Sequence, residues 1–135
     1  MARGDGSTCG STRAATPNVR DSVSVRATFE WVRDQVEHSV DFERHAVTCR
    51  ASEVLAERTG FCYAKSHLLA VLLRANEIPA GFCYQRLSVN DDGAPYCLHG
   101  LNAVYLDDYG WYRIDARKYG FDQSKLLPAH RVARL

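Results

Sequence analysis

The sequence contains no apolar stretch that approaches the roughly 18 residues needed to span a membrane. Its first ten residues, MARGDGSTCG, lack the apolar core of a secretory signal. Positive and negative charges nearly balance, with 17 Lys and Arg against 16 Asp and Glu, and no long run of like charge occurs. Such a chain presents no field that would attract nucleic acid or anionic lipid. We therefore expect a cytoplasmic protein that binds neither nucleic acid nor membranes and whose partners are recognised by a specific site.

The five cysteines form no Cys-x-x-Cys pair, which is the usual spacing of structural zinc ligands. The closest Cys/His spacing is Cys97-Leu98-His99. An odd number of cysteines leaves at least one thiol free, and a chain of 135 residues can fold without disulfide bonds. We therefore expect no metal and no other cofactor, and we keep as an alternative a zinc-stabilised module that uses Cys97, His99 and another cysteine.

The first 20 residues are rich in Gly, Ser, Thr, Ala and Arg and carry almost no apolar side chains. Because such a segment cannot bury enough surface to offset the entropy of ordering, residues 1–20 are predicted to form a flexible arm. The rest of the chain has the length of one globular domain, which we place at residues 21–135.

Three helices are predicted in the first part of this domain. The first begins at Asp21 or Ser22, because apolar residues then recur with helical spacing at Val25, Phe29, Val32 and Val36. Residues 51–58 predict a short second helix. Gly60 is expected either to end this helix, as the residue after its C-cap, or to form a tight turn. Residues 62–76 predict the strongest helix, and it is apolar on so many sides that we expect it to be central and buried.

Strands are predicted after Pro79, which stops the central helix. Aromatic and β-branched residues are frequent in three segments, residues 82–89, 96–107 and 111–116. Turn-forming residues separate these segments at positions 90–93 and 107–110. Because the helices precede the strands, the sequence predicts an α+β fold with an antiparallel meander.

Cys62 opens the predicted central helix. Unpaired N–H groups and the positive end of the helix dipole favour a thiolate at that position. Gly60 gives the backbone freedom for a sharp entry, and the Cys62 amide could then donate to an oxyanion. Cys62 could equally be a small buried apolar residue, so its position alone does not decide between the two interpretations.

A histidine and an aspartate on consecutive predicted strands could activate this cysteine. His99 would take the thiol proton, and Asp115 would hold the histidine ring in the correct tautomer and orientation. With a turn centred on Tyr109, both side chains point to the same face of the sheet, but a strict ladder offsets them by about four positions, roughly 13 Å. A bulge, strand twist or an earlier turn must close that gap. His67 is rotated about 140° around the helix from Cys62 and is not expected to be the base.

These features resemble the core domain of bacterial-type members of the transglutaminase-like superfamily. The resemblance rests on Gly60-Phe61-Cys62, on the helix end LLRANEIPA at 72–80, on the strand that begins at Gly81, on His99, and on Gly110-Trp111-x-x-x-Asp115. It extends from about Val25 to Tyr119. The resemblance implies a papain-related α+β fold, in which the helix that bears the cysteine packs on an antiparallel sheet that bears the histidine and aspartate.

The resemblance also implies acyl chemistry through a thioester. Cys62 is the expected nucleophile, His99 the general acid and base, and Asp115 the residue that orients His99. The expected substrate is a peptide or carboxamide. Members of the family often carry a tryptophan shortly after the histidine, whereas this chain reads His99-Gly100-Leu101-Asn102. The absence of this tryptophan favours hydrolysis of the thioester over transfer of the acyl group to an amine. The alternative is a non-catalytic module that binds a peptide in the same cleft.

Overall fold

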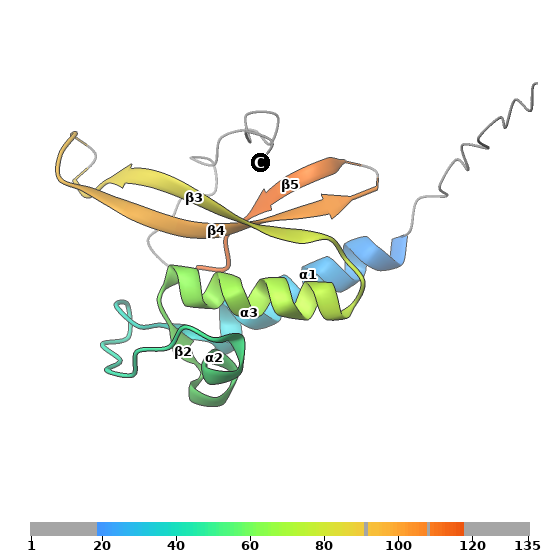
Figure 1. Ribbon diagram of the computed structural model, residues 1–135, viewed down its shortest axis with the longest axis horizontal. Helices are drawn as coiled ribbons and strands as arrows, with labels where there is room; N and C mark the ends of the chain where they lie inside the picture. The colour runs from blue at the N-terminus through green and yellow to red at the C-terminus, as the bar shows by residue number, and fades with distance from the viewer. Residues whose placement is uncertain (1–18, 91, 108, 118–135) are drawn as a thin grey trace, which may run out of the picture.

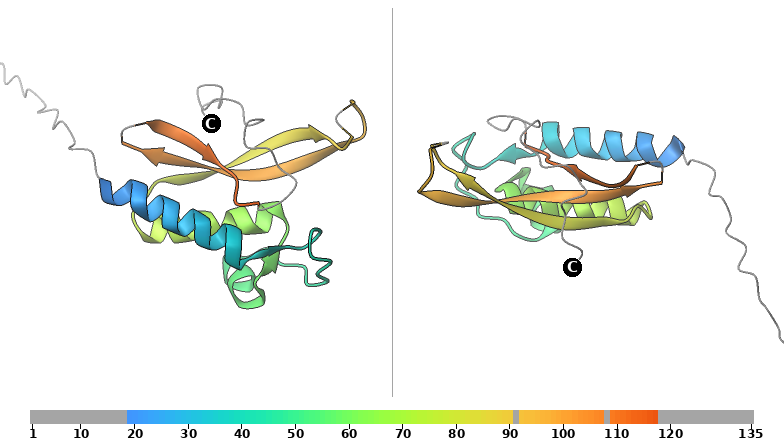
Figure 2. Two further views of the ribbon diagram at one scale, coloured as in Figure 1. Left: turned by 180° about the vertical axis from the view of Figure 1, so that it is seen from behind. Right: turned by 90° about the horizontal axis from the view of Figure 1, so that it is seen from above.

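The computed structural model describes residues 19–90, 92–107 and 109–117. Helices precede an antiparallel sheet, as the sequence predicts, in the order α1 (Val19–Gln35), β1 (Glu37–His38), α2 (Ala51–Glu57), β2 (Thr59–Gly60), α3 (Cys62–Ala75), β3 (Ala80–Ser88), β4 (Tyr96–Leu106) and β5 (Gly110–Ile114). Figure 1 shows α3 beneath the sheet and α2 on the far side of α3, and Figure 2 shows α1 running alongside α3. The predicted α+β class is confirmed.

Helix α1 buries the stripe that its sequence predicts. Val25, Val32 and Val36 are buried in the core, and Phe29 packs against it. The helix begins at Val19, so residues 19 and 20, which were expected to belong to the flexible arm, are helical. The remainder of the predicted arm and the end of the predicted domain, residues 1–18 and 118–135, lie outside the described residues. No helix in the described part of the chain is long and apolar enough to cross a membrane.

Helix α3 is the centre of the core. Its buried side chains include Leu68, Leu69 and Leu73, which are at most 1% exposed and pack between the sheet and the other helices. The predicted central helix is confirmed almost to the residue, although Val71 is 49% exposed and the buried face is narrower than the sequence indicates. Ile78 N donates to Leu73 O at 3.0 Å after the last turn, which directs the chain into β3.

The sheet has the order β3-β4-β5 with both neighbouring pairs antiparallel, so the predicted meander is confirmed. Strand β5 pairs with β4 from Leu106↔Gly110 to Asn102↔Ile114. One further step in this register sets Asp115 across from Leu101, two positions from His99. The turn is therefore centred one residue earlier than Tyr109. The offset between His99 and Asp115 falls from about four positions to two, which is roughly 7 Å along the strands.

A short parallel bridge joins β1 to β2, with His38 paired to Gly60. Helix α2 ends at Glu57, and its C-cap Arg58 has the left-handed conformation with a φ of 56°. Gly60 lies in β2, so the prediction of a helix-ending or turn glycine at this position is wrong. A Cβ at Gly60 would lie 3.0 Å from both Ala64 Cβ and Thr48 Oγ1. A side chain at this position would have to displace these atoms, so the close packing of β2 against the start of α3 favours glycine.

Candidate active site

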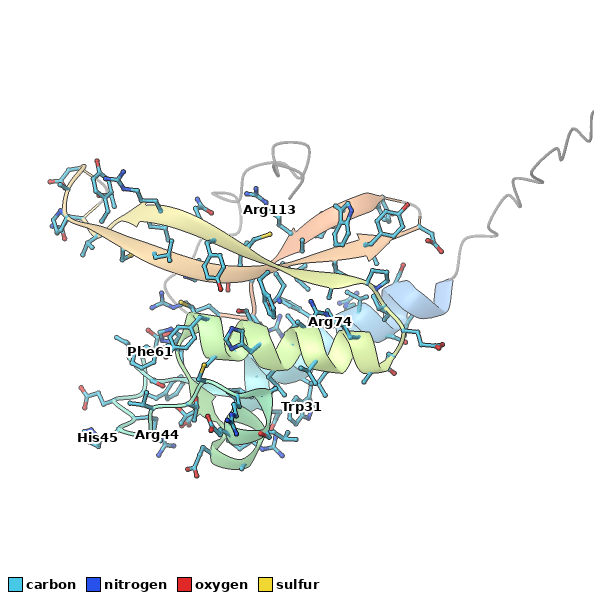
Figure 3. All side chains as sticks on the ribbon, in the orientation of Figure 1. Trp31, Arg44, His45, Phe61, Arg74 and Arg113 are labelled. Carbon is cyan, nitrogen blue, oxygen red and sulfur yellow. The ribbon has the colours of Figure 1, made fainter. Side chains whose placement is uncertain are left out.

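Cys62 lies at the first turn of α3, where the sequence places it. Phe61 precedes it as the N-cap with extended backbone, φ −68° and ψ 170°, and Figure 3 shows the Phe61 ring at this end of the helix. The thiol is half-buried, and Gly100 N donates to its sulfur at 3.4 Å. The nucleophile candidate therefore lies between the helix start and strand β4.

His99 and Asp115 are brought together by the register of β4 and β5. His99 Nε2 lies 2.7 Å from Asp115 Oδ2, and both residues are 3% exposed. Asp115 Oδ1 accepts a second hydrogen bond from Arg117 N at 3.1 Å. His99 also hydrogen-bonds Cys62, and because Nε2 faces Asp115, Nδ1 is the nitrogen that remains for the sulfur. The three residues singled out by the sequence thus form one connected group.

The charge states of this group favour a thiolate. Burial is the largest influence on Cys62 and opposes ionisation, but hydrogen bonds from His38, His99 and Gly100 outweigh it and lower the thiol pKa to about 5. Burial also opposes the charged form of His99, but hydrogen bonds to Asp115 and Cys62 raise the imidazole pKa to about 9. Between these two pKa values the site holds a thiolate–imidazolium pair, which is the reactive form of a cysteine nucleophile.

His38 is a site residue that the sequence reasoning did not single out. It is 6% exposed, and its ring meets Phe61 edge-on with centroids 6.3 Å apart. Its side chain hydrogen-bonds Cys62, and its Nδ1 lies 3.6 Å from Asp41 Oδ2. Strand β1 has only two residues, so no periodic pattern marks it in the sequence. The pairing to β2 that aligns His38 with the nucleophile segment becomes visible only in the folded chain.

Arg117 connects the two carboxylates near the cysteine. Its Nη2 donates to Asp41 Oδ1 at 2.8 Å and its Nε to Asp41 Oδ2 at 3.2 Å, while its backbone N–H binds Asp115. The hydrogen bonds from Arg117 outweigh the effect of burial and lower the pKa of Asp41. Asp41 and Asp115 are therefore both held in place as hydrogen-bond acceptors beside the two histidines.

Lys65 is a buried lysine one turn after Cys62, with 2% of its surface exposed. Its Nζ donates to Val36 O at 2.6 Å, which ties the end of α1 to α3. Burial lowers the Lys65 pKa to about 8, against the opposing attraction of Asp115 and Asp41. When protonated, this ammonium offsets part of the negative charge that the two carboxylates bring to the interior.

The other sequence candidates have different surroundings. His67 Nδ1 lies 2.7 Å from Cys49 O, and the His67 ring packs between Tyr63 and Phe82. These contacts give His67 a structural role. Among the residues that the structure describes, no three His, Cys, Asp or Glu side chains are grouped so that they could hold a metal. A hollow of about 570 Å³ at the ends of α1 and α2 includes none of the three predicted site residues.

Gly100 allows a close approach of β4 to α3, and this contact gives a stability prediction. A Cβ on Gly100 would lie 3.0 Å from Tyr63 Cα, which is backbone and cannot rotate away. We expect Gly100→Ala to lower the free energy of unfolding by about 1–3 kcal/mol in a urea titration, because the strand must shift from the helix. Gly81→Ala is the matched control, since a Cβ there meets no atom within 4 Å. Equal losses in the two variants would contradict this explanation.

Fold and site together define an α+β protein with a papain-like Cys-His-Asp arrangement. The model of the transglutaminase-like superfamily matches residues 10–116, which is most of the chain, and the protein belongs to that superfamily. No curated protein is detectably similar. The family match begins nine residues before the helix that the structure describes, inside the segment expected to be an arm.

The solved structures that are similar to the chain include the following two. A "putative cysteine protease" from Cytophaga hutchinsonii is 25% identical with a TM-score of 0.53, over 76% of this chain and 32% of that one. The periplasmic domain of TgpA from Pseudomonas aeruginosa, bound to ethylmercury, is 19% identical with a TM-score of 0.47, over 68% of this chain and 36% of that one. This chain therefore spans about a third of each of these structures.

Proposed function

We propose that the protein is a cysteine-dependent acyl-transfer enzyme that acts on peptide or carboxamide bonds through a thioester on Cys62. The observation that carries this proposal is the hydrogen-bonded position of His99 between the Cys62 thiol and the buried Asp115 carboxylate. A structural cysteine needs no such partners, whereas a nucleophilic cysteine needs both a proton acceptor and a group that orients it.

The reaction follows from the charge states of the site. The Cys62 thiolate attacks the carbonyl carbon, and the carbonyl π electrons move onto oxygen as the S–C bond forms. The C–N bond then breaks, the leaving nitrogen takes the proton from the His99 imidazolium, and a thioester remains on Cys62. Neutral His99 next removes a proton from the acceptor as it attacks the thioester carbonyl. Release of the acyl product restores the thiolate–imidazolium pair.

Water is the acceptor that we favour. The residues after His99 are Gly100, Leu101 and Asn102, and the last two are each 1% exposed. Leu101 and Asn102 are buried, and none of the three residues is a tryptophan that could shield a thioester from water. The similarity to the Cytophaga hutchinsonii structure, described as a "putative cysteine protease", also supports a hydrolase. A peptide bond is accordingly the first substrate class to test.

Alkylation with iodoacetamide tests the nucleophile directly. At about pH 6 the Cys62 thiol, with a pKa of about 5, is mostly ionised, whereas an ordinary thiol is almost wholly protonated. We expect Cys62 to be labelled on the order of 100-fold faster than an exposed ordinary thiol at that pH. Mass spectrometry of peptides from the intact labelled protein measures the rate at each cysteine.

Cys49 and Cys97 are internal controls in the same molecule, because both are exposed and free. In His99→Ala the thiol loses a hydrogen bond and a positive neighbour that lower its pKa, so the labelling at about pH 6 should fall toward the rate of Cys97. Wild-type labelling of Cys62 that is no faster than that of Cys97 would reject the enzyme and favour a non-catalytic peptide-binding module.

A further inference from the structure

His38 is aligned with the nucleophile segment by the parallel bridge between β1 and β2. The bridge pairs His38 with Gly60, two residues before Cys62. Backbone hydrogen bonds flank this pair, from Glu37 N to Arg58 O at 2.9 Å and from Ser39 N to Gly60 O at 3.1 Å. The backbone that carries His38 is therefore fixed relative to the start of α3.

The His38 ring is also held by its surroundings. It is 6% exposed, with Phe61 edge-on against it and Asp41 Oδ2 3.6 Å from Nδ1. Asp41 accepts two hydrogen bonds from the Arg117 guanidinium. Burial and ring packing restrict the movement of the ring, and its Nδ1 has no hydrogen-bond partner among the described residues.

Side-chain hydrogen bonds from both His38 and His99 lower the pKa of the Cys62 thiol, but the carboxylates beside the two histidines are placed differently. Asp115 lies 2.7 Å from His99, in a full hydrogen bond, whereas Asp41 lies 3.6 Å from His38 and gives its two oxygens to Arg117. Asp115 is thus placed to stabilise an imidazolium, as a general acid and base requires. Asp41 lies beyond hydrogen-bond distance of His38, so the His99–Asp115 hydrogen bond has no counterpart at His38.

The oxygen that becomes negative during the attack is two bonds from the Cys62 sulfur. Because only two bonds separate the two atoms, a ring N–H of His38 beside the sulfur also lies close to this oxygen. Enzymes that form an oxyanion commonly hold it with about two donors, and the sequence offers the backbone N–H of Cys62 as a candidate for one of them.

We propose, on the basis of the function proposed above, that His38 is a catalytic residue that donates a ring N–H to the Cys62 sulfur and then to the substrate oxyanion. No proton leaves His38 in this role. The S–C bond forms, the carbonyl electrons move onto oxygen where His38 stabilises them, and they return as the leaving nitrogen departs with the proton from His99.

Two reactions of the same sulfur separate this role from a structural one. Alkylation by iodoacetamide displaces iodide and forms no oxyanion, whereas acylation by p-nitrophenyl acetate passes through a tetrahedral oxyanion. Both rates are measured in full-length wild type, His38→Leu and His38→Gln, with p-nitrophenolate release and mass spectrometry as readouts. We expect His38→Leu to slow acylation on the order of 100-fold and to leave alkylation within about tenfold. His38→Gln retains an N–H donor and should recover part of the acylation rate.

Equal slowing of both reactions in His38→Leu would assign His38 a structural role and overturn the proposal, and so would an unchanged acylation rate. The alkylation rate of the part-buried Cys83 in each variant reports whether the rest of the fold is preserved, because loss of the fold would expose this thiol. Failure of the proposed function is distinguishable, because wild-type Cys62 would then react slowly with both reagents before any substitution at His38.

Discussion

Replacing Cys62 with alanine is expected to lower kcat for peptide hydrolysis on the order of 10⁶-fold, to the rate that the remaining site can support without a nucleophile. The loss is this large because no other residue takes over a covalent step: alanine leaves His99 without a thiol proton to accept and the substrate without an attacking atom. The measurement is the cleavage of a peptide mixture followed by mass spectrometry, with turnover of p-nitrophenyl acetate as a second assay.

Cys97→Ala is the matched control for this substitution. It removes the same atom from an exposed cysteine on β4, two residues before His99, and should keep the wild-type rate in both assays. Cys62→Ser retains an oxygen nucleophile, but a hydroxyl does not form a stable anion beside the His99 imidazolium, so this variant should also be nearly inactive. Appreciable turnover by Cys62→Ala would contradict a thioester mechanism on this residue.

Much of the fold could be predicted because it depends on local patterns. The apolar spacing that predicts α3 reflects burial on several sides of one helix, and Leu68, Leu69 and Leu73 are indeed buried there. The strands follow from runs of β-branched and aromatic residues between turn-forming segments, and β3, β4 and β5 lie within a few residues of their predicted positions. Cys62 opens the helix that its sequence context predicts.

The features that could not be predicted depend on tertiary contacts. The centre of a turn sets the register of a hairpin, and a shift of one residue moves Asp115 two positions closer to His99. No periodicity could have fixed that register, because both alternatives keep the same face of the strand inward. The bridge that brings His38 to the site has two residues on each side and is held by the close packing of Gly60 on Ala64 and Thr48. The catalytic role of each site residue remains a prediction that the proposed variants test.

Asp115→Asn is expected to lower kcat on the order of 10⁴-fold, because the site requires two acceptor oxygens at this position. Oδ2 accepts from His99 Nε2, while Oδ1 accepts from Arg117 N. An asparagine has only one acceptor oxygen. If that oxygen keeps the backbone N–H of Arg117, the amide NH₂ faces His99 Nε2 and forces the ring proton onto Nδ1. The ring then has no acceptor for the thiol proton, so the thiolate–imidazolium pair cannot form.

The pH dependence of the residual rate separates this explanation from general damage to the fold. The wild-type rate should rise as Cys62 ionises through a pKa of about 5 and fall as His99 loses its proton through a pKa of about 9. Asp115 raises the pKa of His99, so its neutralisation should move the alkaline limb to lower pH and narrow the plateau. Asp107→Asn makes the same substitution at an exposed turn and should leave rate and profile unchanged. An alkaline limb that stays at about pH 9 in Asp115→Asn would show that another group carries the acid, and would remove His99 from that role.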